Sequence, residues 1–527
     1  MSSRIVDTVD AMVSGGSDLV VLDGVGFGVT DVVRLADGDA RPVPGTDAMK
    51  RATESWDAAR QIAATGRVYG RSTGVGANRN EDVPTEAAAE HGLRLLRSHA
   101  GAIGDELPAR EVRAMLAVRA NQLLAGGAGL RPTVVTALCE ALESGVYPVV
   151  NEFGSVGTGD IAALAQVGLA LVGEHPWRGP GDARGAASGG RDASAPSARP
   201  LAGVPEPQPL DNNDALALIS SNALTLGQSA LALDELRGLI GATQVVGALS
   251  LLAVDGSHEP YAAPVHAARP HRGSTEVARR MRELIGAADR PTPPLGRIQD
   301  PYGFRCLPQI HGPAHDAADA LEAVLAIEIN AAAENPFISA EDMTAYHHGG
   351  FYQAQLVLAL DHFRLALTQV ARLSTSRLSS LNEPAFTRLK PFLADNEAAS
   401  SGVMILEYSA AAALGDLRAF SAPASLGHAV LSRGVEEQAS FASLAARQTL
   451  RACRAYRLVV GCELVAAVRA LRQRGLRPDP ELPVGRALEL AESVLDDETA
   501  DRPLTDDVTT AAGLLDRFTE IWRGSTS

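Results

Sequence analysis

Apolar positions recur at intervals of three and four residues through most of the chain, and this pattern predicts amphipathic α-helices. In the first third of the chain the periodicity covers about 48–64, 85–100, 108–125 and 132–145. The Ala/Leu-rich run at 161–172 predicts a further, buried helix with Asp160 at or near its N-cap.

Two later stretches are longer than ordinary helices and contain no internal breaker. They cover about 352–381 and 435–474, and the second stops at Gly475 with Pro478 beyond it. Helices of this length are typical of bundles. The predicted fold class is therefore mainly all-α, an elongated bundle of long antiparallel helices with a small mixed N-terminal region.

Two regions depart from the helical pattern. Near the N-terminus, residues 19–22 are apolar and β-branched and 25–33 partly alternate, which predicts short strands. The tract at 178–209 is rich in Gly, Ala, Ser, Pro and Arg, lacks the apolar residues of a core, and is expected to be a flexible insertion. The expected organisation is an N-terminal region, the insertion, a central long-helix bundle and a C-terminal helical region, at 1–177, 178–209, 210–475 and 476–527.

Composition narrows the function classes. Apolar residues make up 46% and aromatic residues only 4%, so the core is built from Ala, Leu and Val, which favours close-packed helices. A net charge of −16 argues against nucleic acid or an anionic membrane as partner. The 4 cysteines form no C-x-x-C pair, the N-terminus has no signal-peptide core, and no uncharged apolar run of ~18 residues stands out. A cytoplasmic location is expected.

Two glycine-rich segments are candidates for chemistry. Residues 154–160, G-S-V-G-T-G-D, place three glycines directly before a predicted helix, which indicates a tight turn at a helix N-terminus. Residues 66–78 form a second glycine-rich loop. This loop lacks the lysine of a phosphate-binding P-loop and shows no strand–turn–helix context, so a phosphate cradle is not favoured.

Several spaced motifs follow one another in the chain. Their sequences are Y-G-R-S-T-G-V-G, L-L-R-S-H-A, V-R-A-N, Q-D-P-Y-G-F-R-C and E-N-P, at 69–76, 95–100, 118–121, 299–306 and 334–336. In order and spacing, over roughly 45–470, they resemble the aromatic amino acid lyase family, which contains histidine, phenylalanine and tyrosine ammonia-lyases and related aminomutases. The argininosuccinate lyase and fumarase superfamily is set aside because its G-S-x-x-M-P-x-K-x-N loop is absent.

The resemblance implies a particular electrophile. Ammonia is a poor leaving group, and ordinary side chains are nucleophiles, so an electrophile must be added. The family cyclises and dehydrates an Ala-Ser-Gly tripeptide to a methylidene-imidazolone, as the glycine amide attacks a carbonyl two residues upstream. Here the segment has seven residues where the family has eight, and the tripeptide becomes Gly157–Thr158–Gly159. Either Thr158 dehydrates, which leaves an extra methyl on the reactive carbon, or no group forms and the scaffold has another task.

The resemblance also assigns site residues one by one. Tyr69 matches the general base, and Arg305 matches the arginine that binds the substrate carboxylate, a task suited to a bidentate guanidinium. Tyr302, Gln299 and Asn335 match polar residues around the electrophile and the carboxylate, and Phe351 matches an active-site aromatic. His99 and Glu436 match positions typical of histidine enzymes, where a carboxylate near an imidazole is reasonable. As a helical residue beside Glu437, Glu436 also fits a solvated helix face.

Two further segments depart from the family. The I-N-G-T segment appears as Ile219-Ser220-Ser221-Asn222, so its asparagine is displaced by two positions, and N-F-H appears as G-F-Y at 350–352. These changes and the altered tripeptide concern one predicted pocket, which indicates a divergent member.

The function expected from the resemblance is a non-oxidative ammonia-lyase for histidine or an aromatic amino acid, with Tyr69 abstracting the β-proton. The alternatives are an aminomutase that uses the same electrophile and a rewired, non-catalytic homologue that lacks it. The resemblance implies a homotetramer whose sites take residues from several chains. It implies no metal or nucleotide cofactor.

Overall fold

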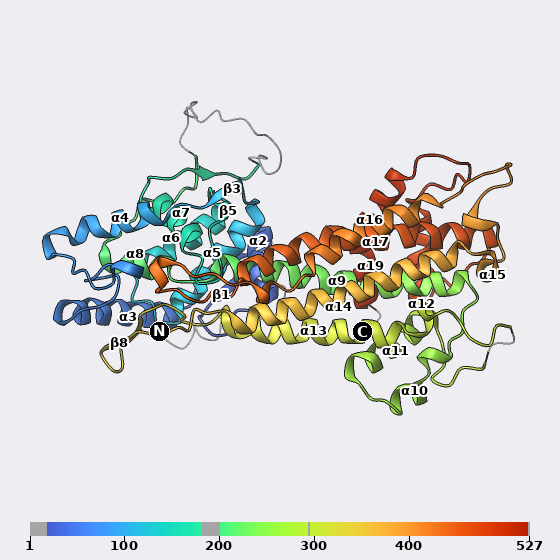
Figure 1. Ribbon diagram of the computed structural model, residues 1–527, viewed down its shortest axis with the longest axis horizontal. Helices are drawn as coiled ribbons and strands as arrows, with labels where there is room; N and C mark the ends of the chain where they lie inside the picture. The colour runs from blue at the N-terminus through green and yellow to red at the C-terminus, as the bar shows by residue number, and fades with distance from the viewer. Residues whose placement is uncertain (1–17, 182–200, 294–295, 525–527) are drawn as a thin grey trace, which may run out of the picture. The chain divides into compact units, whose positions relative to one another are not determined.

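The computed structural model describes residues 18–181, 201–293 and 296–524 and is mainly helical, as predicted (Figure 1). The chain forms two compact units. The first contains Met1–Leu231, Glu322–Leu358 and Ala424–Arg447, and the second contains Ala232–Leu321, Ala359–Pro423 and Gln448–Ser527. The domain boundaries expected at 177, 209 and 475 stay a prediction. Residues 182–200 of the expected insertion lie outside the described residues.

The N-terminal mixed region begins the first unit. Strand β1 (Leu19–Leu22) pairs in parallel with β2 (Arg41–Pro44), and helix α2 (Val29–Asp37) connects them. The strand expected over 25–33 is wrong, because residues 25–28 form no strand and α2 begins at Val29. Val32 and Leu35 lie at helical spacing on the buried side of α2, and this burial decides the conformation.

Helix α5 (Ala109–Leu124) is the core of the first unit and is buried from Val112 onward. It packs against α2 and α6, and α4, α7 and α8 pack against one another. The bounds of the other helices are α3 (Thr46–Thr65), α4 (Ala88–His99), α6 (Thr133–Ser144), α7 (Ile161–Leu171) and α8 (Asn212–Ile219). Short antiparallel pairs connect them: β3 (Ile103–Glu106) with β5 (Asn151–Phe153), β4 (Tyr147–Pro148) with β6 (Trp177–Arg178), and β7 (Phe337–Ser339) with β8 (Thr344–Tyr346).

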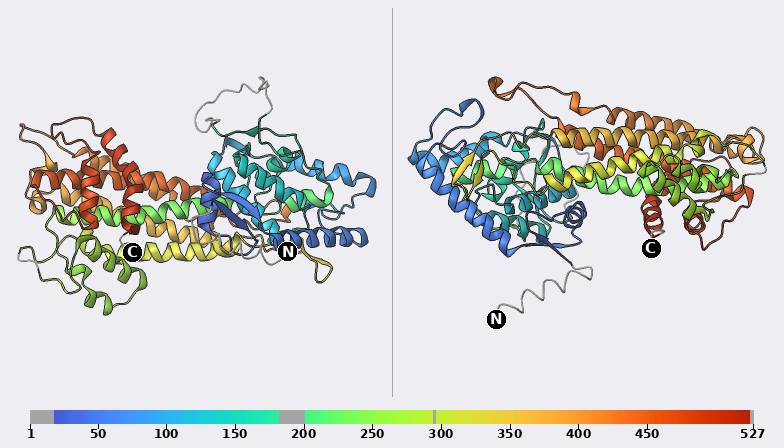
Figure 2. Two further views of the ribbon diagram at one scale, coloured as in Figure 1. Left: turned by 180° about the vertical axis from the view of Figure 1, so that it is seen from behind. Right: turned by 90° about the horizontal axis from the view of Figure 1, so that it is seen from below.

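Long helices make up most of the second unit, where parts of α9, α13, α14 and α17 lie side by side (Figures 1 and 2). The helices that contribute to it are α9 (Ala223–Ala253), α10 (Ala263–Ala267), α11 (Arg272–Ile285), α12 (Tyr302–Arg305), α13 (Leu307–Glu328), α14 (Ala354–Leu381), α15 (Pro384–Thr387), α16 (Ile405–Phe420), α17 (Ala442–Arg474), α18 (Pro483–Glu492) and α19 (Thr505–Gly524). The 3₁₀ turns of the two units are η1 (Gly76–Asn78), η2 (Thr85–Ala87), η3 (Glu259–Tyr261), η4 (Pro391–Leu393), η5 (Ala424–Leu426) and η6 (Ser432–Gly434).

The stretch Asn212–Ala253 is long and apolar enough to cross a membrane by composition, with a mean hydropathy of 1.5 in its most apolar window. The expectation that no such apolar run occurs in the chain is therefore wrong. In the structure 89% of that window is buried, which is what a core helix of a globular fold shows.

The second predicted long helix begins later than its periodicity indicated. Helix α17 starts at Ala442 rather than near 435, so the helical placement of Glu436 is wrong. Arg433 and Phe441 both have a φ of 56°, in the left-handed region, and Glu436 forms a β-bridge with Leu431. These local conformations, which apolar spacing does not encode, exclude a helix before Ala442.

Candidate active site

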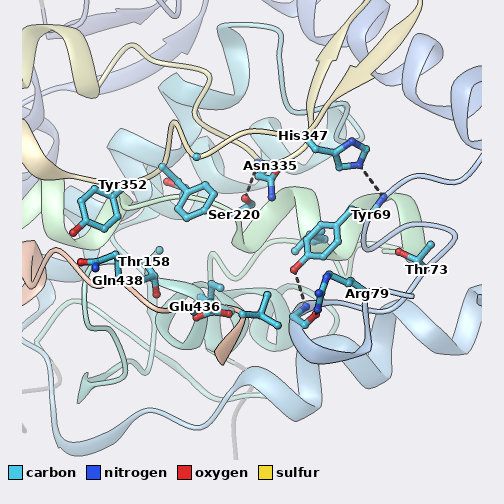
Figure 3. Close-up of a pocket in the computed structure, with 18 of the residues that line it drawn as sticks. Tyr69, Thr73, Arg79, Thr158, Ser220, Asn335, His347, Tyr352, Glu436 and Gln438 are labelled. Atoms are coloured by element: carbon cyan, nitrogen blue, oxygen red, sulfur yellow. Dashed lines mark hydrogen bonds between the residues drawn. The ribbon is translucent and has the colours of Figure 1, made fainter. Parts of the chain in front are cut away.

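A cavity of about 700 Å³ lies in the first unit (Figure 3). It is lined by the loop at 67–80, the glycine turn before α7, the C-terminal end of α8 and the segments 335–352 and 435–438. Among the predicted site residues, it brings together Tyr69, Thr158, Gly159, Asn335, Phe351 and Glu436. Gly157 is the residue before Thr158 in the same turn. The volume suits a small organic ligand.

Tyr69 is held by contacts at both ends of the residue. The Gly76 backbone N–H donates to the phenolic oxygen at 2.8 Å, and the Tyr69 backbone N–H donates to His347 Nε2 at 3.3 Å. The two rings also meet edge to face, with centroids 6.5 Å apart. Burial raises the pKa of Tyr69 above its usual value, and the charge of Glu436 adds to this, while the Gly76 hydrogen bond and Arg79 oppose it.

A buried ion pair supports the part of the cavity wall that contains Ser220 and Asn335. Arg119 of α5 donates to Glu334 Oε1 at 2.7 Å and to the Leu218 carbonyl at 3.0 Å, and its side chain is almost fully buried. This pair fixes the end of α8 beside Asn335, whose backbone N–H donates to Ser220 Oγ at 3.0 Å. Breaking such a pair would leave an uncompensated buried charge, so the wall is rigid.

The turn before α7 has two residues with positive φ. Gly157 has a φ of 86° and Gly159 a φ of 115°, values that L-residues with a side chain rarely adopt. Ser155 Oγ bridges the turn, since it donates to the Gly159 carbonyl at 3.0 Å and accepts from the Gly157 N–H at 3.1 Å. The turn therefore presents Thr158 to the cavity.

Asp160 is the N-cap residue of α7, as predicted, but its side chain makes no capping hydrogen bond to the first turn of the helix. Its buried carboxylate accepts from the backbone N–H of Thr225 at 2.7 Å and from the Thr225 hydroxyl at 2.9 Å. Burial raises the pKa of Asp160, and the hydrogen bonds from Thr225 and Ser155 oppose the increase.

Glu436 lines the cavity from an irregular segment, not from a helix face. The alternative of a solvated helix face therefore fails. Phe351 lies nearby, and its carbonyl accepts from the Asn222 amide at 2.7 Å. Ser220 and Ser221 line the cavity. The displaced Asn222 does not line it and is buried against the Phe351 backbone.

His99 lies elsewhere, at the end of α4. It lines a second cavity, of about 350 Å³, together with Gly74, Glu81 and other residues of the loop that follows Tyr69. Its Nδ1 lies 2.9 Å from the Leu95 carbonyl. The structure does not bring His99 to the Tyr69 cavity, and its substrate role stays a prediction.

Gln299, Tyr302 and Arg305 belong to the second unit and do not line the Tyr69 cavity. Tyr302 is 69% exposed, and the Arg305 guanidinium carbon lies 4.6 Å from the centre of its ring. Arg305 Nε is buried without a hydrogen-bond partner in the described part of the chain. The Arg305 guanidinium therefore lies over the Tyr302 ring, and its Nε–H is still able to donate a hydrogen bond.

Several cavity residues were not predicted as site residues. Arg79, His347 and Gln438 line the cavity beside the predicted side chains. The adjacent histidines before Gly349 and the arginine that ends the glycine-rich loop were signals in the sequence. Their place in the cavity depends on the tertiary fold, which no local sequence pattern indicates.

The sequence and the helical fold match one class of protein, the aromatic amino acid lyases. The family pattern described as "Aromatic amino acid lyase" matches residues 27–493. The chain belongs to this family, whose members are carbon–nitrogen lyases and related aminomutases.

Individual relatives agree with the family assignment. The chain is 34% identical over 463 residues to a histidine ammonia-lyase of Geobacillus kaustophilus, a match that covers 86% of this chain and 89% of the relative. Histidine ammonia-lyase from Trypanosoma cruzi superposes with a TM-score of 0.84 at 26% identity and covers 96% of this chain and 95% of its own. Tyrosine aminomutase from Streptomyces globisporus gives 0.85 at 26% identity, with coverage of 96% and 98%.

The residues of the turn fit the group that the family makes. Ring closure uses the backbone atoms of the tripeptide and the side chain of its middle residue, so the methyl of the first residue is not required. A Cβ at Gly157 would lie 2.2 Å from Ser440 Oγ and 2.8 Å from the Phe441 backbone nitrogen, so alanine is sterically excluded here. Thr158 keeps the β-hydroxyl and lines the cavity. In the described residues, no cluster of three His, Cys, Asp or Glu side chains could hold a metal ion.

Proposed function

We propose that this protein eliminates ammonia from histidine or an aromatic amino acid and releases the α,β-unsaturated acid. One observation carries the proposal: Tyr69 and Thr158 open into the same cavity, together with Glu436. Histidine is the first substrate to test, because the relative from Geobacillus kaustophilus is a histidine ammonia-lyase.

The electrophile is proposed to come from Gly157–Thr158–Gly159. When formed, this methylidene-imidazolone-type group supplies an electrophile that draws electron density from the substrate amine. Tyr69 then removes the β-proton as its phenolate. The Gly76 N–H, which donates to the phenolic oxygen at 2.8 Å, stabilises the phenolate.

Binding of the amino acid is assigned to several groups. Glu436 faces the substrate ring and accepts a hydrogen bond from an imidazole, while Phe351 provides an aromatic wall. Asn335 orients the polar end of the substrate. Arg305 holds the carboxylate, with Tyr302 and Gln299 beside it in the chain. The family resemblance supports a homotetramer, and we propose that these three residues complete the Tyr69 cavity of another copy of the chain.

An aminomutase is the second candidate. Tyrosine aminomutase from Streptomyces globisporus shares the fold and 26% identity, and the same cavity could return the amine to the β-carbon. A rewired homologue that binds an amino acid without the prosthetic group is the third. The products separate these functions, since a mutase gives a β-amino acid and a binding protein gives no product.

The test is an assay of the purified protein with histidine, tyrosine and phenylalanine. The proposal predicts ammonia and the unsaturated acid in equal amounts from one of them. Replacement of Tyr69 by Phe should lower kcat by about 10²- to 10⁴-fold while the fold is kept, because the proton acceptor is lost. Absence of ammonia with all three substrates, or an unchanged kcat in Tyr69→Phe, would overturn the proposal.

We also propose that the protein acts in the cytoplasm, where cysteines stay reduced. Its 4 cysteines are free, which supports this location. Fractionation of cells that make the protein, with detection in the soluble cytoplasmic fraction, tests the proposal. Recovery outside the cell or in a membrane fraction would contradict it.

A further inference from the structure

The glycine turn is clamped by the segment that leads into α17. Ser440, 4% exposed, donates its hydroxyl to the Gly157 carbonyl oxygen at 2.8 Å. On either side, the Phe441 N–H donates to the Val156 carbonyl at 2.8 Å and Ser443 Oγ donates to the Ser155 carbonyl at 2.9 Å. Three consecutive carbonyls of the turn, at 155, 156 and 157, therefore each accept a hydrogen bond from this segment.

Ser440 and Gly157 are sterically complementary. A Cβ on Gly157 would lie 2.2 Å from Ser440 Oγ, so the serine hydroxyl takes the space of an alanine methyl. The φ of 86° at Gly157 also disfavours any side chain. The loss of alanine from the tripeptide thus coincides with a buried donor placed directly on the carbonyl of the same residue.

The Gly157 carbonyl is the one at which the ring would close. The Gly159 nitrogen forms a bond to the Gly157 carbonyl carbon, and the carbonyl oxygen leaves as water with the amide protons of Gly159 and Thr158. A second water takes the Thr158 α-proton and hydroxyl, so no oxidant or reductant is needed. Negative charge develops on the Gly157 oxygen during the first attack, and a preorganised donor stabilises it.

We propose that Ser440 is a catalytic residue for this ring closure, in which its hydroxyl activates the Gly157 carbonyl. This inference rests on the proposed function, because it requires that Gly157–Thr158–Gly159 cyclise. It assigns Ser440 a task that is complete before any substrate binds.

Ser440→Ala removes the donor, and Ser443→Ala is the matched control, because it removes a neighbouring hydrogen bond to a carbonyl outside the tripeptide. Each chain is synthesised in a cell-free reaction. The mass of the proteolytic peptide that contains residues 154–160 is then followed over time. We expect wild type and Ser443→Ala to lose two waters at the same rate and Ser440→Ala to do so roughly tenfold to hundredfold more slowly.

The outcomes separate the two proposals. If wild type and Ser440→Ala lose water equally fast, or if both alanine variants slow equally, Ser440 has no catalytic task and the inference is overturned while the proposed function stands. If the wild-type peptide keeps its full mass, the proposed electrophile and this inference both fail. Should Ser440→Ala not fold, as judged by circular dichroism, Ser440→Cys must show the slower loss, because a thiol is a weak donor.

Discussion

Tyr69 is surrounded by opposing influences that tune its basicity. Burial is the largest of them and raises the pKa of Tyr69, and the negative charge of Glu436 acts in the same direction. The Gly76 N–H and the positive charge of Arg79 favour the phenolate and lower the pKa. Because the phenolate is the proposed base, a raised pKa places the rising part of the pH–rate curve above the usual tyrosine range.

Glu436 and Arg79 should therefore shift the pH dependence in opposite directions. Glu436→Gln removes a charge that disfavours the phenolate, so the rising limb of kcat should move to lower pH. Arg79→Gln removes a charge that favours the phenolate, so the limb should move to higher pH. The measurement is kcat with saturating substrate across the alkaline range.

Glu437→Gln is the control, since Glu437 also lines the cavity but is not among the groups that account for the Tyr69 pKa shift. It should leave the limb in place. Shifts of the same sign in Glu436→Gln and Arg79→Gln would contradict the assignment of Tyr69 as the base.

Among individual residues, the sequence predicted part of the candidate active site. The family resemblance assigned Tyr69, Asn335 and Phe351 to one site, and in the structure all three line one cavity. His99 was grouped with them on its motif alone and lies on a separate cavity. His347 was missed because its contact with the Tyr69 backbone joins residues 278 positions apart.

Among the helices, a buried polar contact joins α9, α14 and α17 within the second unit. Arg377 donates to both oxygens of Glu463, at 2.6 and 2.8 Å, and both side chains are fully buried. The hydroxyls of Ser250 and Ser374 donate to the same carboxylate at 2.7 and 2.6 Å. The Glu463 carboxylate of α17 thus accepts from donors on two other helices, α9 and α14, and this network fixes the register of the three helices.

Arg377→Met should destabilise the protein by about 3–5 kcal/mol, because Glu463 would stay buried without its counter-charge. The double variant Arg377→Met/Glu463→Leu should recover most of this loss. Guanidinium unfolding at one protein concentration provides the measurement. As control, Arg372→Met on the exposed face of the same helix should change stability by no more than about 0.5 kcal/mol. A double variant as unstable as the single one would refute the explanation.

Periodicity predicted where helices lie better than it predicted the residues at which they begin and end. The helix predicted over 48–64 is α3 (Thr46–Thr65), and that over 352–381 is α14 (Ala354–Leu381), because apolar spacing reports burial of one face. Apolar spacing placed the start of α17 too early, because left-handed residues such as Phe441 exclude a helix before Ala442. The Phe441 N–H also donates to the Val156 carbonyl of the glycine turn, a tertiary contact that apolar spacing does not report.

For the whole molecule, the proposed catalytic groups fall in different units. Tyr69 and Thr158 belong to the first unit, whereas Arg305 belongs to the second. If copies of the chain complete one another's sites, two inactive variants should rescue each other when they are mixed in one oligomer.

Tyr69→Phe and Arg305→Ala, each inactive alone, should regain ammonia-lyase activity when they are produced together. Some mixed sites would then combine an intact Tyr69 cavity with an intact Arg305. Tyr69→Phe with Thr158→Ala is the matched control and should stay inactive, because both side chains line a single cavity of one copy. No rescue in the first pair, despite mixed oligomers on a sizing column, would contradict shared sites.

Ammonia elimination by this protein requires that its shortened turn still make the electrophile of the family. The most direct measurement is the mass of the peptide with residues 154–160 from the purified wild-type protein. If the turn has cyclised, the peptide mass is lower by two waters, with the loss located at Gly157–Thr158–Gly159. An unmodified peptide would show that no electrophile forms and would leave the chain as a rewired member of the fold.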